Sequence, residues 1–101
     1  MLNQVILVGR IAKFQEEEEK TIIILAIPRS YKNNEGIYET DFIDCQLFGS
    51  IAKNTTEFCK NGDIVGIKGR IEKSNNETII IADKITFLTS KKPTEEEKEE
   101  E

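Results

Sequence analysis

Residues 38–72 read YETDFIDCQLFGSIAKNTTEFCKNGDIVGIKGRIE, and this run predicts a strand, a helix and a second strand in succession. The strands are expected over Tyr38–Phe48 and Asp63–Glu72, where apolar residues alternate with polar ones. Between them, Ser50 is a typical residue for the start of a helix, and Asn61-Gly62 for its end. The helix would carry an apolar face made of Ile51, Ala52, Thr55, Phe58 and Cys59.

Three further segments predict strands because they are rich in isoleucine, valine and leucine: Leu2–Ile11, Thr21–Ile27 and Thr78–Leu88. Turn residues lie at Asn33–Gly36 and Ser74–Glu77. Five strands with one helix between the third and the fourth are the order of an OB-fold, a Greek-key barrel that binds nucleic acids or oligosaccharides. The expected fold class is therefore an all-β, five-stranded OB-fold barrel. Gly66 and Gly69 fit it, since glycines within strands mark bends or close backbone approach.

The composition is typical of one globular domain without catalytic chemistry. The chain has 101 residues, of which 38% are apolar and 33% are charged. It has no histidine, which excludes Ser-His-Asp and Cys-His sites and imidazole metal centres, so we expect no enzyme, cofactor or metal. Cys45 and Cys59 make no disulfide framework and are expected to be reduced and buried. No run is apolar enough to span a membrane and no leader precedes Leu2, so we expect a cytoplasmic protein.

The negative charge is concentrated at the end of the chain. Residues 1–92 hold 13 basic and 13 acidic residues, whereas residues 93–101 hold one lysine and six glutamates. A like-charged run without apolar residues predicts disorder, so we expect a folded domain over residues 1–90 and a disordered acidic tail over residues 91–101. A second acidic run, Glu16–Glu19, is expected to be a solvated loop tip. The alternative for both runs is a contribution to solubility alone.

The third strand predicts a binding surface. Alternation places Ile43, Cys45 and Leu47 on one face of that strand. The other face mixes aromatic and polar side chains: Tyr38, Thr40, Phe42, Asp44, Gln46 and Phe48. Exposed aromatics among polar groups are suited to stacking on nucleic-acid bases, which contributes about 1–3 kcal/mol per base. The alternative is a bulge that shifts the register and buries Phe42 or Phe48.

Three blocks of sequence resemble the bacterial single-stranded DNA-binding protein family: Met1–Arg10, Glu39–Ile43 and Gly62–Ile71, within a match over residues 1–88. The resemblance implies a homotetramer of OB-folds that wraps single strands and stacks bases on aromatic side chains. Tyr31 and Phe42 fall where relatives commonly carry tryptophan, and Phe48 falls at an aromatic position of the family. Tyr38 matches nothing in the family pattern.

The chain also departs from the family. The turn at Ser74–Glu77 replaces a long loop that carries another stacking aromatic in relatives, and the first loop is short and filled with glutamates. The tail lacks the short apolar tip with which relatives recruit replication and repair enzymes, so such partners remain uncertain. As an alternative, the tail competes with DNA for the basic surface. The chain thus resembles a short-loop member of the family with an atypical tail.

Basic residues on or beside the strands are the candidates for phosphate contacts: Arg10, Arg29, Lys32, Lys68, Arg70 and Lys73. Lys68 and Arg70 are expected to point outward, opposite Val65, Ile67 and Ile71. The alternative for each is an ordinary solvated charge. Lys53 and Lys60 on the helix are expected only to aid solubility.

Three segments are apolar on both faces, although one side of a barrel strand should meet water: Val5–Val8, Ile22–Leu25 and Ile79–Ile81. A subunit interface would cover that second face, so we expect a homo-oligomer, either the tetramer implied by the resemblance or a dimer.

The function we expect is sequence-independent binding and protection of single-stranded DNA in replication, recombination or repair. One alternative is a protein-interaction OB module of a replication or mobile-element complex, with weak or no DNA binding. Another is binding of single-stranded RNA, since stacking alone does not distinguish the two nucleic acids.

Overall fold

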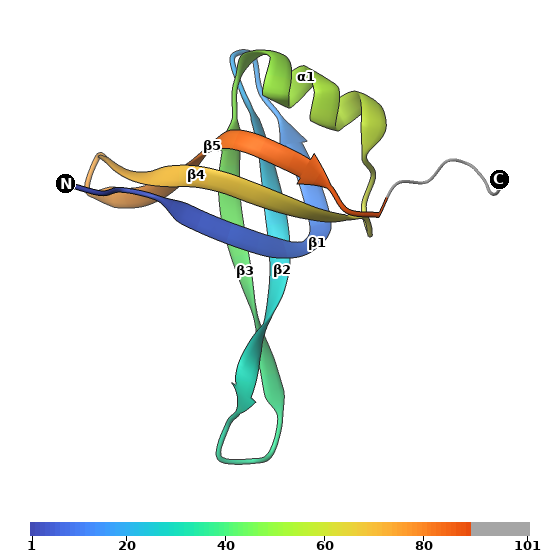
Figure 1. Ribbon diagram of the computed structural model, residues 1–101, viewed down its shortest axis with the longest axis vertical. Helices are drawn as coiled ribbons and strands as arrows, with labels where there is room; N and C mark the ends of the chain where they lie inside the picture. Colours follow the sequence, from blue (N-terminus) through green and yellow to red (C-terminus); the bar gives the residue numbers. More distant parts are fainter. Residues whose placement is uncertain (90–101) are drawn as a thin grey trace, which may run out of the picture.

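The five predicted strands and the helix between the third and the fourth are present in the computed structural model, which describes residues 1–89 (Figure 1). The elements are β1 (Val5–Glu16), β2 (Thr21–Lys32), β3 (Tyr38–Leu47), α1 (Gly49–Phe58), β4 (Ile64–Ser74) and β5 (Glu77–Phe87). They form a closed barrel in the order β1-β2-β3-β5-β4. The predicted acidic tail, residues 91–101, lies outside the described residues.

β1 connects the two halves of the barrel. Its first half pairs antiparallel with β4, from Val5 opposite Gly69 to Arg10 opposite Ile64. Its second half pairs with β2, and a bulge between Ile11 and Lys13 marks the bend. β3 and β5 close the barrel through a short parallel ladder of two register pairs, Cys45 with Ile80 and Gln46 with Ile81.

Alternating side chains fill the barrel. The fully buried core is Ile11, Ile23, Leu25, Cys45, Leu47, Val65 and Ile67. Ile51 and Ala52 on α1 pack against this cluster, so the helix covers one end of the barrel (Figure 1). Thr55 is fully buried on the same helix, and its hydroxyl donates to the carbonyl oxygen of Ile51 at 2.7 Å. On the third strand, Cys45 and Leu47 are fully buried and Ile43 packs against the core, which confirms the core face predicted for this strand.

β2 and β3 continue beyond the barrel as a long hairpin, which we call the arm (residues 28–42; Figure 1). The predicted end of the second strand at Ile27 is wrong, because the backbone pairing continues past Pro28 although the apolar pattern stops there. The predicted first strand, Leu2–Ile11, is likewise displaced, since β1 begins at Val5 and runs to Glu16. The turn at the tip of the arm is as predicted: the Asn33 carboxamide oxygen accepts from the backbone N–H groups of residues 35 and 37.

The helix ends differ from the prediction. Phe48, in an extended conformation, occupies the N-cap without a side-chain capping bond, so Ser50 lies inside the first turn. The helix stops at Phe58, before Asn61-Gly62, and the backbone N–H of Cys59 closes the last turn on Thr55. Phe58 is exposed rather than packed on the predicted apolar face, and its ring lies 6.3 Å from that of Phe87.

β4 and β5 meet through a two-residue turn in which Asn75 and Asn76 both have positive φ angles, 51° and 68°. A bulge between Lys68 and Gly69 brings Gly69 against the backbone of Ile81. Of the two roles expected for glycines of this strand, a bend or a close backbone approach, the close approach is present at Gly69, whereas at Gly66 an added Cβ would make ordinary contacts at 3.7–3.9 Å. Beyond the bulge, Ile71 is exposed instead of pointing inward.

Candidate nucleic-acid interface

The aromatic face of β3 is open to solvent. Phe42 is 63% exposed and Phe48 is 42% exposed, whereas Cys45 and Leu47 between them are fully buried. The alternative in which a bulge buries Phe42 or Phe48 is therefore wrong. A phenylalanine that contributes nothing to the core leaves its ring faces free for a planar ligand.

The three predicted stacking residues lie along the strands rather than in one cluster. Tyr31, which is 62% exposed, falls in the irregular segment of β2 between Pro28 and Lys32. Phe42 lies where the arm joins the barrel, and Phe48 lies beyond the end of β3. Phe48 is six positions after Phe42, a span of about 20 Å at 3.3 Å per residue of extended chain. A ligand that contacts all three must be long and flexible.

The acidic loop between β1 and β2 lies beside Phe48. Glu17–Lys20 and Phe48 together line an open pocket of about 420 Å³. The glutamates are exposed, as predicted for a solvated tip, and the N–H of Glu17 donates to the carbonyl of Lys20 at 2.8 Å. Phosphate groups next to Phe48 would therefore meet like charge from Glu17, Glu18 and Glu19.

Register places Arg10 in line with Phe42. Arg10 is the partner of Ala26, and Ala26 is the partner of Phe42, so the three residues cross the outer surface of β1, β2 and β3 as one row. The Arg10 guanidinium donates to the carbonyl oxygen of Gly62 at 2.9 Å. Ala26 in the middle of the row has a small side chain, so the Phe42 ring on one side of it and the Arg10 guanidinium on the other remain accessible.

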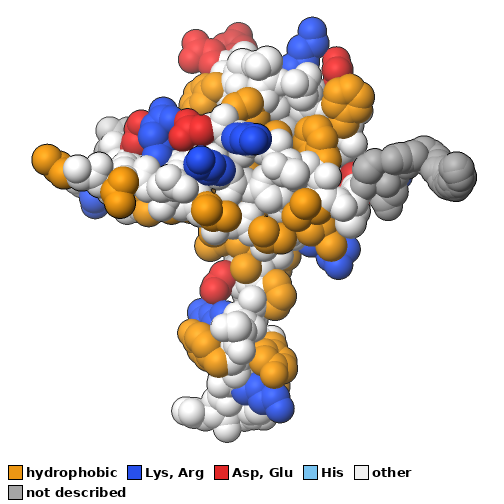
Figure 2. All heavy atoms as spheres, viewed as in Figure 1, with side chains coloured by type: hydrophobic (Ala, Val, Ile, Leu, Met, Phe, Trp, Pro, Cys, Tyr) orange, Lys and Arg blue, Asp and Glu red, His pale blue; other side chains and the backbone are white. Residues whose placement is uncertain are grey.

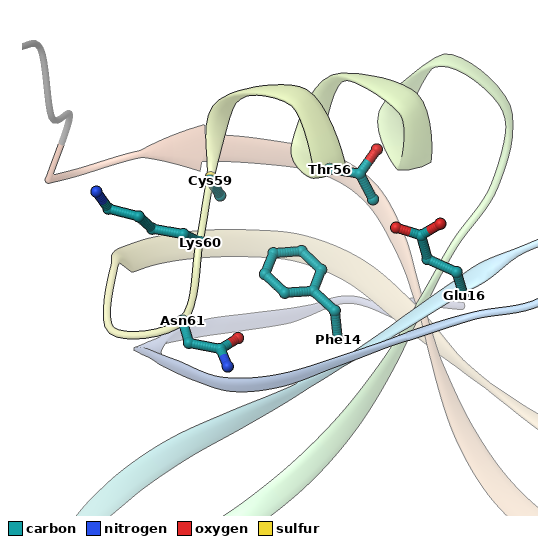
Figure 3. A pocket seen from close by; sticks show the side chains of 6 residues that line it. All are labelled: Phe14, Glu16, Thr56, Cys59, Lys60 and Asn61. Carbon is teal, nitrogen blue, oxygen red and sulfur yellow. The ribbon is translucent and has the colours of Figure 1, made fainter.

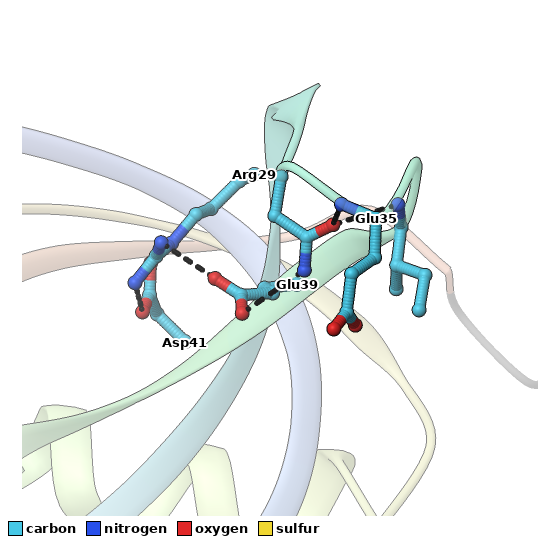
Figure 4. A network of polar contacts seen from close by, with 6 residues as sticks. Arg29, Glu35, Glu39 and Asp41 are labelled. Atoms are coloured by element: carbon cyan, nitrogen blue, oxygen red, sulfur yellow. Dashed lines mark hydrogen bonds and ion pairs between the residues drawn. The ribbon is translucent and has the colours of Figure 1, made fainter.

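Arg29 is held by two carboxylates of the arm (Figure 4). It contacts Asp41 through two bonds, from Nε at 3.1 Å and Nη2 at 3.0 Å, and its Nη1 contacts Glu39 at 2.8 Å. The bonds to Asp41, with a further effect of nearby Tyr31, raise the pKa of Arg29, and Arg29 in turn lowers the pKa of Asp41. A phosphate group would have to compete with both carboxylates for this guanidinium.

Arg70 is paired in the same way, with Glu72 at 2.9 Å and with Asp83. The hydrogen bond to Glu72, followed by the charge of Asp83, raises its pKa. By contrast, Lys32, Lys68 and Lys73 have no carboxylate partner within the described residues 1–89. Among the predicted phosphate contacts, these lysines thus carry charges that no nearby carboxylate neutralises.

Lys68 lies on an apolar surface formed by β1, β4 and β5. Figure 2 shows apolar and basic side chains gathered over these strands. Ile6 and Val8 are 68% and 54% exposed, and Ile6 is the register partner of Lys68, which is itself the partner of Lys84. Lys84 was not among the sequence candidates. The alternation of β5 places it on the outer surface, but only the register places it beside Lys68.

The comparisons with known proteins agree with this geometry. The model of the Single-strand binding protein family matches residues 2–88. The chain belongs to this family. It is 34% identical to Single-stranded DNA-binding protein B of Bacillus subtilis, over 90% of this chain and 94% of that one. It is 35% identical to Single-stranded DNA-binding protein 3 of Listeria innocua, over 90% of this chain and 66% of that one.

Solved structures of single-strand binding proteins share the fold. A small single-stranded DNA binding protein from Mycoplasma pneumoniae superposes with a TM-score of 0.67 at 22% identity, covering 90% of this chain and 99% of that one. The mitochondrial protein Rim1 of S. cerevisiae gives a TM-score of 0.67 at 20% identity, covering 89% of this chain and 99% of that one. The predicted OB-fold is thereby confirmed.

Members of the single-strand binding protein family are not enzymes. A further pocket lies beside the helix. It is an open hollow of about 530 Å³ between β1 and the end of α1, lined by Phe14, Glu16, Thr56, Cys59, Lys60 and Asn61 (Figure 3). Within residues 1–89, no three His, Cys, Asp or Glu residues gather to hold a metal ion. No helix among these residues is long and apolar enough to cross a membrane.

Both thiols of this single-strand binding protein should be unreactive at neutral pH. Burial, together with the charge of Asp44, raises the pKa of Cys45 to about 12, and burial with the charge of Asp63 raises that of Cys59 to about 11. We expect both to react with Ellman's reagent at pH 8 far more slowly than in urea, with half-buried Cys59 first. Equal rates in buffer and in urea would contradict this burial.

The same shifts predict that the fold loses stability in alkali. A thiol with a higher pKa in the folded chain favours the folded state at any pH below the unfolded value of about 8.5. That contribution is lost as the pH rises from there toward about 11 for Cys59 and about 12 for Cys45. Thermal unfolding of the reduced protein at increasing pH measures the loss, and Cys45→Ala should reduce it.

Proposed function

We propose that this protein binds and protects single-stranded DNA without sequence preference, in the cytoplasm, during replication, recombination or repair. The observation that carries the proposal is the exposed ring of Phe42, on a strand face that contributes nothing to the core. Membership of the Single-strand binding protein family supports it. Base stacking on Tyr31, Phe42 and Phe48 is tolerant of sequence because every base has a π-face.

The phosphate contacts come from Arg10, Arg29, Lys32, Lys68, Arg70 and Lys73. They are not equivalent, because Arg29 and Arg70 must exchange carboxylates for phosphates, whereas the three lysines need not. Lysine contacts make affinity depend on salt, since each neutralised phosphate releases counterions. The salt dependence should therefore be moderate for a protein of this size.

The protein acts as a homo-oligomer, a tetramer or a dimer. Ile6 and Val8 on β1 and Leu88 just past the end of β5 are exposed apolar side chains, and burial of such a surface favours self-association. The acidic tail has no apolar tip, so any recruitment of replication or repair proteins would rest on its charge alone. Sedimentation equilibrium at increasing salt tests the oligomer, and Ile6→Lys with Val8→Lys should dissociate it.

The decisive test is fluorescence anisotropy of a labelled oligo-dT of about 35 nucleotides, long enough for several OB-folds. We expect binding to the single strand that weakens with salt, and much weaker binding to a duplex of equal length. An oligo-U of the same length distinguishes DNA from RNA. No binding even at low salt would overturn the proposal.

A protein-interaction module is the second candidate, and a specific observation favours it. The exposed glutamates beside Phe48 and the carboxylates that pair Arg29 and Arg70 all weaken attraction for phosphates. In that case the apolar surface around Ile6 would contact another protein of a replication or mobile-element complex. The same titration discriminates, because this candidate requires a folded oligomer with weak or no affinity for oligo-dT.

A further inference from the structure

We propose that Tyr38, held by Lys32, is an additional base-stacking residue that acts together with Phe42 on one face of the arm. The proposal rests on the proposed function, since it names a further contact for the same single strand. Tyr38 is 55% exposed and contributes nothing to the core. Its ring is therefore as accessible as those of Tyr31 and Phe42.

Lys32 fixes the position of the Tyr38 ring. The two residues are register partners at the tip of the arm, and the Lys32 ammonium lies 5.7 Å from the ring centroid. A cation at this distance is attracted to the face of a tyrosine ring. The same ammonium can contact the phosphate next to a base that stacks on Tyr38, because Lys32 has no carboxylate partner among residues 1–89.

Tyr38 and Phe42 share one face of β3. They are four positions apart, and an even spacing on a strand places side chains on the same side. The register shift between Pro28 and Lys32 adds its extra residues to β2, so β3 remains regular across this segment. The two rings are about 13 Å apart along the strand, about four base steps at 3.4 Å. Thr40 lies between the two rings, opposite Pro28. Its side chain is smaller than either ring, so it does not protrude between them.

Charge separates this face from the other face of the arm. Glu39 and Asp41 alternate with the aromatic residues, so their carboxylates lie on the opposite side, where Arg29 binds both (Figure 4). The face that carries Tyr38 and Phe42 also carries Lys32. Along β3 from Tyr38, the first carboxylate on this face is that of Asp44. A phosphate backbone thus meets a cation on one face and paired carboxylates on the other.

The composition provides a direct test. The chain has no tryptophan and only two tyrosines, so Tyr31→Phe leaves Tyr38 as the only source of tyrosine emission. Titration of this variant with unlabelled oligo-dT should quench the emission, and the quenching should saturate together with the anisotropy of labelled oligo-dT. Lys32→Gln in the same background should weaken binding and reduce the salt dependence.

Affinity gives the second measurement. Tyr38→Ala should bind oligo-dT about fivefold or more weakly, and Tyr38→Phe should bind as the unmodified protein does. Ile37→Ala is the matched control, an equally exposed apolar residue of the arm on the other parity, and should change nothing. Unchanged emission, or equal affinity of Tyr38→Ala and Ile37→Ala, would overturn the role of Tyr38. Failure of the unmodified protein to bind oligo-dT would instead overturn the proposed function, and this inference with it.

Discussion

Gly69→Ala should lower the free energy of unfolding by about 3 kcal/mol, a large part of the 5–15 kcal/mol typical of a small domain. A Cβ at this position would overlap the carbonyl oxygen of Ile81 and lie 2.9 Å from the carbonyl carbon and 3.1 Å from the Cα of Ala82. These are backbone atoms of a paired strand, so relief requires β4 and β5 to separate. Urea unfolding followed by circular dichroism should show a midpoint lowered by about 1–3 M.

Gly66→Ala is the matched control, because it adds the same methyl group to the same strand. Its Cβ would meet only the Leu88 and Val8 side chains and the carbonyl of Leu7, all at 3.7–3.9 Å. We expect its midpoint to stay close to that of the unmodified protein. Equal midpoints for Gly66→Ala and Gly69→Ala would contradict the close approach of β4 and β5 at the bulge.

Phe42→Ala should weaken binding of oligo-dT by about 5- to 150-fold, the effect of one lost stacking contact of about 1–3 kcal/mol. Because Phe42 is 63% exposed, its removal should hardly change the urea midpoint. The loss should therefore appear in binding and not in stability, which separates a contact with the ligand from a contribution to packing. Anisotropy at low and moderate salt measures it, and the salt dependence should stay the same since no charge is removed.

Phe58→Ala is the control for Phe42→Ala. Phe58 is 66% exposed and lies on α1, away from the arm. The substitution therefore removes the same kind of side chain from an equally open position. Its affinity for oligo-dT should match that of the unmodified protein, although the lost contact with Phe87 lowers stability slightly. A similar loss of affinity in both variants would mean that stacking at Phe42 does not account for binding.

Periodicity predicted the parts of the fold that burial dictates. Alternation in β3 identified Cys45 and Leu47 as core and Phe42 as exposed, because a strand with one buried face allows only one assignment. The helix between β3 and β4 and the two-residue turn at Asn75-Asn76 followed from equally local signals. The exposure of Phe42 and Phe48 was therefore within reach of periodicity, whereas Tyr31 became a candidate only through the family resemblance.

The features that the sequence did not predict depend on register. The pairing of Arg29 with Asp41 joins residues twelve apart across the arm, and the neighbours of Lys68 come from β1 and β5. Neither is visible before the strands are aligned. The β3 side of the arm was predicted from Tyr38 onward, but its β2 side, residues 28–32, was missed because these residues are mostly polar and exposed, so no apolar pattern marks them. The N-cap was missed because Phe48 occupies it through backbone geometry alone.

The closure of the barrel has a consequence for motion. β1 pairs with both β2 and β4 over many residues, whereas β3 and β5 meet over only two register pairs. Local opening costs least free energy where the fewest hydrogen bonds break. Amide protons that bond across β3 and β5 should therefore exchange with solvent before those that bond across β1 and β4. The β2–β3 and β4–β5 hairpins then behave as two units hinged on β1, and a long flexible ligand bound to both would slow their separation.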